Sequence, residues 1–211
     1  MEQLFDLSIW AIIGFMLASY SVIGNDSIQT LGTFIAANEK INWKWKFMFG
    51  ALVFCTIVFF CWYTNNGDIA YGRLARIDYI EPRWYHVMAP AILLLLTRYG
   101  IPVSTTFLVF SVFASGFILE KIIVKSVMGY GVAAVTAYVL WLVISSYIDE
   151  KTDRVKQKNI RYWRVAQWVS SSYLWVTWLQ HDMANIAVYL PRQISVEVLI
   201  FVLSVGVLIL G

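Results

Sequence analysis

Charged side chains are scarce in this sequence. Asp, Glu, Lys and Arg make up 14% of the 211 residues, whereas 60% are hydrophobic, and the mean hydropathy is +0.67. Water-soluble domains contain about 25% charged residues, and a soluble fold of this length could not bury so much apolar surface. The composition therefore excludes a soluble globular domain and indicates an integral membrane protein.

Cysteine is also rare, and the N-terminal segment lacks basic charge. Cys55 and Cys61 lie six residues apart in one apolar run, on different faces of a helix, without acidic or histidine neighbours at ligand spacing. We expect both to be ordinary lipid-facing or core residues. Residues 1–6 contain no Lys or Arg, and no small-residue cleavage site follows them, so a cleaved signal peptide is not expected.

The few cations are placed as in a membrane protein. The net charge of +3 is too small to indicate a nucleic-acid partner. Residues 149–164 carry six Lys or Arg against three acids, so we expect this segment on the cytoplasmic side. Trp43 and Trp163 stand beside basic residues, as in the aromatic belt at a bilayer surface. We expect a multi-pass protein of the plasma membrane, or of the inner membrane in a bacterium.

Apolar runs mark the expected spans, because a helix needs about 20 residues to cross the hydrocarbon core. Residues 47–63 and 127–148 are uninterrupted runs, and residues 196–210 form a shorter one. Three other runs contain polar breaks, at residues 24–26, 100–106 and 180–182. We expect an all-α multi-span bundle with interrupted or re-entrant helices and an incomplete inverted repeat. The expected parts are a first transmembrane repeat (1–148), a cytoplasmic basic loop (149–164) and the start of a second repeat (165–211).

Two of the breaks share a pattern. Residues 25–29 read Asn-Asp-Ser-Ile-Gln and residues 181–185 read His-Asp-Met-Ala-Asn, so each has an Asp followed three positions later by a carboxamide. That spacing places both groups on one helical face. Corresponding interruptions in two repeats indicate a midplane binding site in secondary transporters, and an Asp in the membrane costs about 2.5 to 3.5 kcal/mol on insertion scales. The expected cation ligands are Asn25, Asp26, Gln29, Asp182 and Asn185, with Asp26 and Asp182 holding sodium.

The pattern has a simpler explanation as well. Short polar segments recur by chance, and Asp182 could lie near an interface rather than at the midplane. The third break, residues 102–106, reads Pro-Val-Ser-Thr-Thr and offers hydroxyls and free helix amides to an anion. Its alternative is a Ser or Thr cap on a new helix. The expected anion-binding residues are Ser104, Thr105, Thr106 and Ser27.

At these residues the sequence resembles the inorganic phosphate transporter (PiT) family. That family carries a Gly-Ala-Asn-Asp-Val-Ala-Asn motif and a Pro-Val-Ser-Thr-Thr-His motif in each of two inverted halves. Residues 24–26 with Gln29 look like the first acidic motif, residues 101–106 like the hydroxyl motif, and residues 182–185 like the second acidic motif. The resemblance covers these short stretches and not the whole chain.

The sequence departs from the family pattern at several positions. Phe107 stands where the family has His, His181 replaces the first Asn of the second motif, and Gln29 replaces an Asn. A second hydroxyl motif is missing. We expect the chain to be truncated, to work with a shortened second half, or to complete its site with another copy or a second subunit.

The resemblance implies cation-coupled uptake of phosphate. The family Asp and Asn side chains would hold sodium, and the Ser and Thr hydroxyls would hold the anion. Oxygen ligands suit a hard ion such as sodium, and a nearby cation offsets the repulsion between carboxylate and phosphate. We expect symport with sodium rather than a proton, with phosphate, sodium and the lipid bilayer as partners. Sulfate or other oxyanion permeases, and a non-transporting membrane subunit, stay open as alternatives.

Two other classes fit parts of the sequence less well. Asp26 and Asp182 could form the acid pair of an aspartyl protease, but the Gly-rich signature of such aspartates is absent. His86 and His181 could ligate a haem, yet His86 follows the aromatic pair at 84–85, as expected of an interfacial residue. We therefore expect a transporter and not an enzyme, with no cofactor besides the coupling ion.

Overall fold

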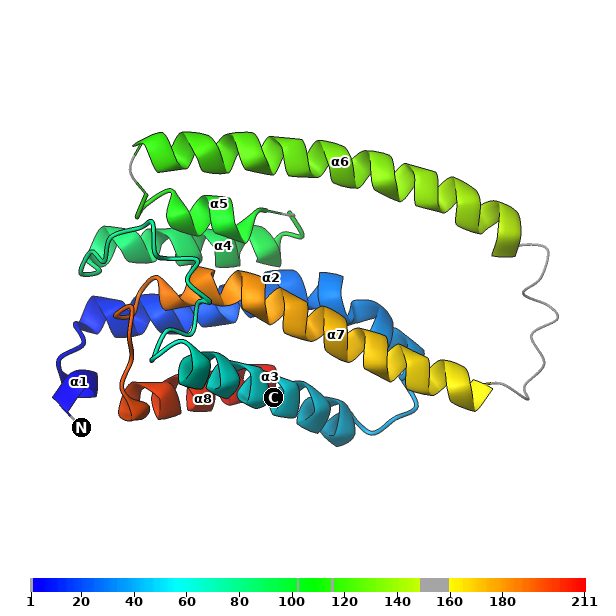
Figure 1. Cartoon of the computed structure of the whole chain (residues 1–211), viewed down its shortest axis with the longest axis horizontal. Coiled ribbons are helices and arrows are strands. Elements are labelled where there is room, and N and C mark those ends of the chain that lie inside the picture. The colour runs from blue at the N-terminus through cyan, green and yellow to red at the C-terminus, as the bar shows by residue number, and fades with distance from the viewer. Residues whose placement is uncertain (1, 102, 115, 149–159) are drawn as a thin grey trace.

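The protein is built from helices. The computed structural model describes residues 2–101, 103–114, 116–148 and 160–211, and these ranges contain helices and connecting segments but no strand. The all-α prediction is confirmed for this part of the chain. The elements (Figure 1) are α1 (Glu2–Phe5), α2 (Ile9–Ala37), α3 (Trp43–Thr64), the 3-10 helix η1 (Trp84–Val87), α4 (Met88–Arg98), α5 (Thr105–Phe110), α6 (Gly116–Ile148), α7 (Ile160–Ala187) and α8 (Val196–Leu210).

Helices α2 and α7 form the centre of the bundle. They pack side by side and run in opposite directions, as the colours in Figure 1 show. Helices α3 and α8 pack on one side of this pair, and α4 and α5 pack on the other. Trp175 on α7 and Val198 on α8 are fully buried in the shared core. Residues 165–211 therefore belong to the same core as the helices of the expected first repeat.

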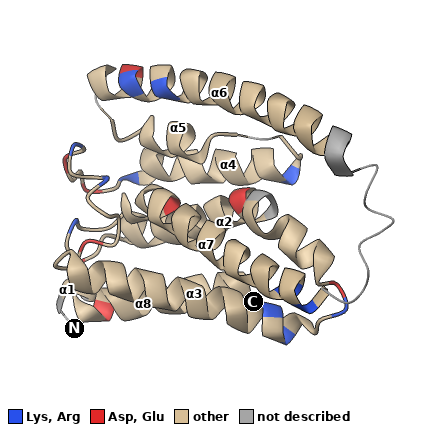
Figure 2. Ribbon diagram, turned by 45° about the vertical axis from the view of Figure 1, so that its right-hand side comes forward, with Lys and Arg blue, Asp and Glu red and all other residues tan. Residues whose placement is uncertain are grey.

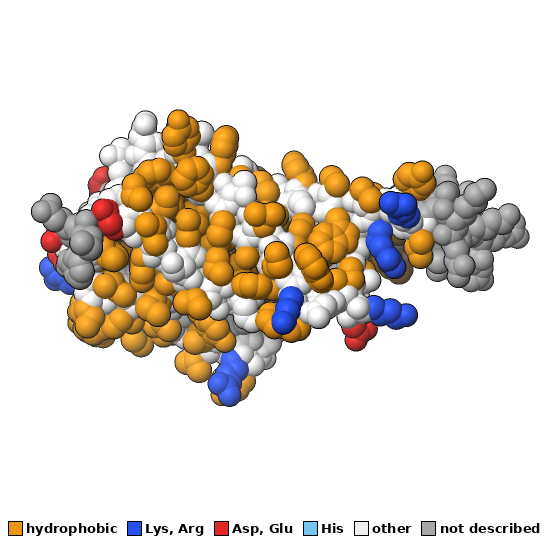
Figure 3. Space-filling view, turned by 90° about the horizontal axis from the view of Figure 1, so that it is seen from below, with side chains coloured by type: hydrophobic (Ala, Val, Ile, Leu, Met, Phe, Trp, Pro, Cys, Tyr) orange, Lys and Arg blue, Asp and Glu red, His pale blue; other side chains and the backbone are white. Residues whose placement is uncertain are grey.

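Three helices are long and apolar enough to cross a membrane within the described ranges. Their apolar segments are Ile9–Ser27, Trp43–Thr64 and Gly116–Ser145. The segment in α6 has none of its residues buried, and a helix that is hydrophobic on all sides without protein around it suits a lipid environment. Figure 3 shows hydrophobic side chains over much of the face that α3 and α8 form.

The expected breaks at residues 24–26 and 180–182 are not present. α2 and α7 each continue as one α-helix through these positions. Polar side chains interrupt a helix mainly when they hydrogen-bond to its own backbone. Asn25 instead donates to the carbonyl of Val103, 78 residues away, so the helical backbone of α2 is undisturbed. The prediction of interrupted helices is therefore wrong at both acidic motifs.

The third break does end a helix. Helix α4 ends at Arg98 and α5 begins at Thr105, and the two helices pack against each other as a hairpin. Gly100 has a φ of +70°, which glycine adopts without steric cost. Pro102 lies outside the described residues.

Other predicted boundaries shift. The last apolar run, 196–210, forms α8 with the predicted bounds. The predicted run 127–148 is the C-terminal part of α6, which begins earlier, at Gly116, because long Lys side chains can extend from a helix without breaking it. Of the expected loop at 149–164, residues 160–164 belong to α7, and the remainder lies outside the described ranges.

The connection between α3 and η1 is non-helical and packs against the bundle. Ile69, Ala70 and Leu74 are buried against the bundle. The side chain of Arg73, from the same segment, contacts the ring of His181 on α7. This segment therefore lies against α7, next to the acidic motif of that helix.

Candidate functional site

Two acidic residues lie in the middle of the bundle. Figure 2 shows most charged residues near the ends of the helices, whereas α2 and α7 carry acidic residues in the interior, Asp26 and Asp182. Asp26 is buried and Asp182 is partly buried. Neither forms an ion pair with another described residue. Because the two helices are neighbours, the two motifs that resembled each other in sequence meet in space.

Neutral donors from three helices surround Asp26. The Asn25 side chain donates to Asp26 Oδ1 at 2.6 Å. Thr105 Oγ1 from α5 and Trp178 Nε1 from α7 each donate to Asp26 Oδ2 at 3.4 Å. These bonds hold the carboxylate in place without neutralising its charge, because every donor is uncharged.

Asn25 fixes the α4–α5 hairpin to α2. Its Nδ2 donates to the Val103 carbonyl at 3.2 Å, and its Oδ1 accepts a hydrogen bond from Thr97 at 3.2 Å. Both of these residues belong to the hairpin, one in α4 and one just before α5. The asparagine therefore positions the hydroxyl motif rather than acting only as a ligand.

Asn185 joins the second acidic motif to the hydroxyl motif. It is fully buried, and its Nδ2 donates to Asp182 Oδ1 at 2.7 Å and to the hydroxyls of Thr105 and Thr106 at 3.2 Å each. Its Oδ1 has no hydrogen-bond partner among the described residues. Leaving a buried acceptor unsatisfied costs about 1 to 3 kcal/mol, so this amide is held between the two motifs at a cost in stability.

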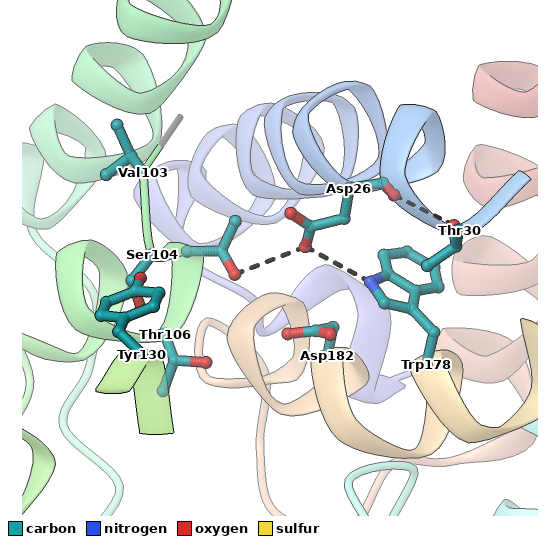
Figure 4. Close-up of a pocket in the computed structure, with 9 residues that line it drawn as sticks. Asp26, Thr30, Val103, Ser104, Thr106, Tyr130, Trp178 and Asp182 are labelled. Carbon is teal, nitrogen blue, oxygen red and sulfur yellow. Dashed lines mark hydrogen bonds between the residues drawn. The ribbon is translucent and has the colours of Figure 1, made fainter. Parts of the chain in front are cut away.

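A cavity of ≈ 510 Å³ lies between these motifs. Liquid water takes about 30 Å³ per molecule, so the cavity has room for a small oxyanion with a cation and some water. Figure 4 shows Asp26 and Asp182 facing it from α2 and α7, with the hydroxyl residues on the hairpin side. The lining residues are Asp26, Thr30, Val103, Ser104, Thr105, Thr106, Tyr130, Trp178 and Asp182.

The three hydroxyl residues have different roles. Ser104 is the N-cap of α5, and its Oγ accepts the Phe107 N–H at 3.3 Å, so the helix-cap interpretation holds for this residue. Thr105 bridges the two acidic motifs, since it donates to Asp26 and accepts from Asn185. Thr106 accepts from Asn185 and keeps its hydroxyl at the cavity.

Two predicted ligands do not join this site. Ser27 lines a different depression, beside Glu39 and Lys46, so the structure does not place it with the other anion-binding candidates. On a helix, the residue after Asp26 points about 100° away from it, which explains the separation. The backbone of Gln29 lies in α2, but its side chain is outside the described residues.

Other site residues were not predicted from the sequence. Thr30 and Trp178 both line the cavity, and each lies four positions from an acidic residue on its own helix. That spacing places them on the acidic face and could have identified them. Tyr130 reaches the cavity from α6, and no sequence pattern connects it with the motifs.

The remaining candidates for metal or haem binding have other contacts. His86 is buried, its Nδ1 accepts the Arg83 N–H at 2.9 Å, and its ring stacks on Phe113. His181 contacts Arg73. No group of three or more His, Cys, Asp or Glu side chains suited to a metal is found in the described ranges. A cation at the site would therefore rely on a mixed set of carboxylate, amide and hydroxyl oxygens.

Comparison with known proteins supplies no relative for this arrangement. The chain matches no protein-family model, no curated protein and no solved structure. In its described ranges the chain is an all-helical protein with three membrane-length apolar helices. Its interior cavity is lined by two carboxylates and three hydroxyl residues of one hairpin.

Proposed function

We propose that this protein is a secondary transporter that carries inorganic phosphate across the membrane together with a cation, sodium rather than a proton. One observation carries the proposal: three polar motifs that are far apart in the sequence line a single interior cavity. Thr105 lies 79 residues from Asp26, and Trp178 lies 152 residues from it, yet both hydrogen-bond to its carboxylate.

The cation would bind at the carboxylates. Asp26 and Asp182 both line the cavity, and neither forms a close ion pair with a described residue, although the charge of Arg73 acts on Asp182 at longer range. The free Oδ1 of Asn185 adds a neutral oxygen from the same region. A hard monovalent ion among these oxygens would offset the cost of burying two carboxylates in an apolar bundle.

The anion would bind on the hairpin side. Thr106 and Ser104 present hydroxyls at the cavity, opposite the acidic helices. Two carboxylates that line the same cavity repel an oxyanion until a cation lies between the carboxylates and the anion. Sodium binding would therefore raise the affinity for phosphate, and phosphate binding would raise the affinity for sodium by the same factor. This mutual dependence is what symport requires.

Two variants of the proposal use the same geometry. Hydroxyl donors suit sulfate or another tetrahedral oxyanion as well as phosphate. A membrane subunit that binds these ions but needs a partner to move them is the second candidate. The exposed apolar surface of α6 favours it, because that surface offers room for helices of another subunit.

Uptake into proteoliposomes tests these proposals. We expect radiolabelled phosphate to accumulate when an inward sodium gradient is applied. Competition by unlabelled sulfate shows whether the site distinguishes phosphate from sulfate. Asp26→Asn should abolish the sodium dependence, whereas Asp6→Asn, which changes an exposed acid outside the long helices, should not. Uptake that is insensitive to sodium and to Asp26→Asn would refute the symport proposal. Binding of both ions without uptake would support the subunit alternative.

A further inference from the structure

A second cavity adjoins the first. It measures ≈ 940 Å³ and lies between the 65–83 segment, α5 and α6. Ser104, Thr106 and Tyr130 line both cavities, so the two spaces meet at the hydroxyl motif. The expected anion site therefore has a large neighbouring space on the side away from Asp26.

This second cavity is basic. Arg73 and Arg76 line it from the 65–83 segment, and Lys121 and Lys125 line it from α6. Among the described residues, no acid lines it. Lys121 and Lys125 are four residues apart, which places them on one face of α6, and Arg73 and Arg76 are separated by a short turn. We call this group of four cations the basic vestibule.

The charges of the basic vestibule are not neutralised by ion pairs in the described part of the chain. None of the four cations forms an ion pair with another described residue. Lys121 Nζ lies 4.0 Å from the centroid of the Phe117 ring, and Arg73 contacts the neutral acceptor side chain of His181. A cavity lined by one sign of charge concentrates ions of the opposite sign. Four unpaired cations in one cavity therefore define an anion-binding region.

We propose that the basic vestibule binds a tetrahedral oxyanion and delivers it to the hydroxyl motif. Lys121 and Lys125 approach the hydroxyl motif from α6, whereas Asp26 and Asp182 approach it from α2 and α7, so the lysines counteract the repulsion that the two carboxylates exert on an anion. Arg73 has a particular position, because it contacts the residue that precedes Asp182 and interacts electrostatically with Asp182 itself. The delivery step rests on the proposed transport function, but binding at the vestibule does not.

A phospholipid headgroup carries the same phosphate chemistry as the free ion. Phe110, Ile118 and Ile122 also line the cavity and would suit an acyl chain. Continuity with the hydroxyl motif favours the free oxyanion, since Thr106 and Ser104 offer polar contacts at the point where an acyl chain would need apolar ones. The experiment therefore distinguishes free phosphate from a phospholipid headgroup.

Equilibrium dialysis of the full chain in an uncharged detergent, with radiolabelled inorganic phosphate and sodium present, measures the binding directly. We expect K121Q/K125Q to raise the Kd for phosphate by about tenfold, and the difference to shrink at high salt. K40Q/K44Q is the matched control, because it removes the same charge from exposed positions around the start of α3 and should leave the Kd unchanged. Thermal unfolding of all three proteins shows whether each variant is folded.

Three outcomes overturn the proposed vestibule: no phosphate binding by the wild-type chain, a Kd in K121Q/K125Q equal to that of the wild type, or a loss of affinity in K40Q/K44Q as large as that in K121Q/K125Q.

Native mass spectrometry with phosphatidylglycerol tests whether a lipid headgroup occupies the site instead. Retention of that lipid that requires Lys121 and Lys125 and is not displaced by inorganic phosphate would assign the site to a headgroup and overturn the proposal. Phosphate binding that depends on these lysines, combined with no uptake into proteoliposomes, would support the vestibule and refute transport. Sodium-driven uptake with unchanged KM and Kd in K121Q/K125Q would support transport and refute the vestibule.

Discussion

Asn185 donates a hydrogen bond of 2.7 Å to Asp182, one turn before it on α7. The same Nδ2 group reaches the hydroxyls of Thr105 and Thr106, so one side chain connects the second acidic motif with the hydroxyl motif. With its nitrogen committed to these acceptors, the buried Oδ1 is left without a partner in the described part of the chain. One buried amide therefore fixes the position of Asp182 relative to the hydroxyl motif.

Sodium should stabilise the folded protein. A ligand present at about 100 times its Kd adds about 2.7 kcal/mol to the free energy of unfolding. We expect a higher Tm in sodium chloride than in choline chloride at equal ionic strength, and no such difference in Asp26→Asn. An equal Tm of the wild-type protein in both salts would contradict a sodium site at Asp26.

Replacement of Asn185 by Ala should weaken sodium binding. The change removes the free Oδ1 and the donor that orients Asp182, and loss of such orienting groups costs about 10-fold to 100-fold in metal affinity. Sodium titrations monitored by thermal unfolding measure the shift. Ser170→Ala, at an exposed position of the same helix, is the control and should bind sodium like the wild type.

Thr105 is expected to matter more than Ser104 for transport. Thr105→Val keeps the shape but removes the hydroxyl that donates to Asp26 and accepts from Asn185, so uptake should fall sharply. Ser104→Ala should mainly lower stability, by about 0.5 to 2 kcal/mol, because it removes the N-cap of α5. Thr105→Ser retains a hydroxyl and should recover uptake. Equal uptake by Thr105→Val and the wild type would contradict a role in transport for the hydroxyl that joins the two acidic motifs.

The continuity of α2 can be tested at two glycines. A Cβ at Gly24 would meet no atom within 4 Å, whereas a Cβ at Gly14 would overlap the Tyr189 ring. Gly24→Ala should therefore raise the free energy of unfolding by up to about 1 kcal/mol, as expected for Ala in place of Gly within a helix. Gly14→Ala should lower it by about 1 to 3 kcal/mol, because the core is overpacked. Chemical unfolding in detergent measures both, and a strongly destabilised Gly24→Ala protein would indicate a break at that position.

Local sequence patterns predicted helices and turns well where hydropathy or the backbone preference of a single residue decides the structure. The run 196–210 became α8 with the same bounds, and the turn after α4 follows from Gly100, because the backbone preference of glycine acts locally. The expected breaks at 24–26 and 180–182 failed because polar residues were read as helix breakers. Their side chains are satisfied by other helices, and sequence alone does not show such partners.

The sequence by itself determined the apolar helices and the residue types of the two acidic motifs and the hydroxyl motif, because hydropathy and helical spacing are local properties. Only the tertiary structure decided which of these groups meet. It placed Trp178 and Thr105 on Asp26, moved Ser27 to another face and brought Arg73 beside His181. Those contacts depend on the antiparallel packing of α2 and α7 and on the position of the hairpin, which no single segment specifies.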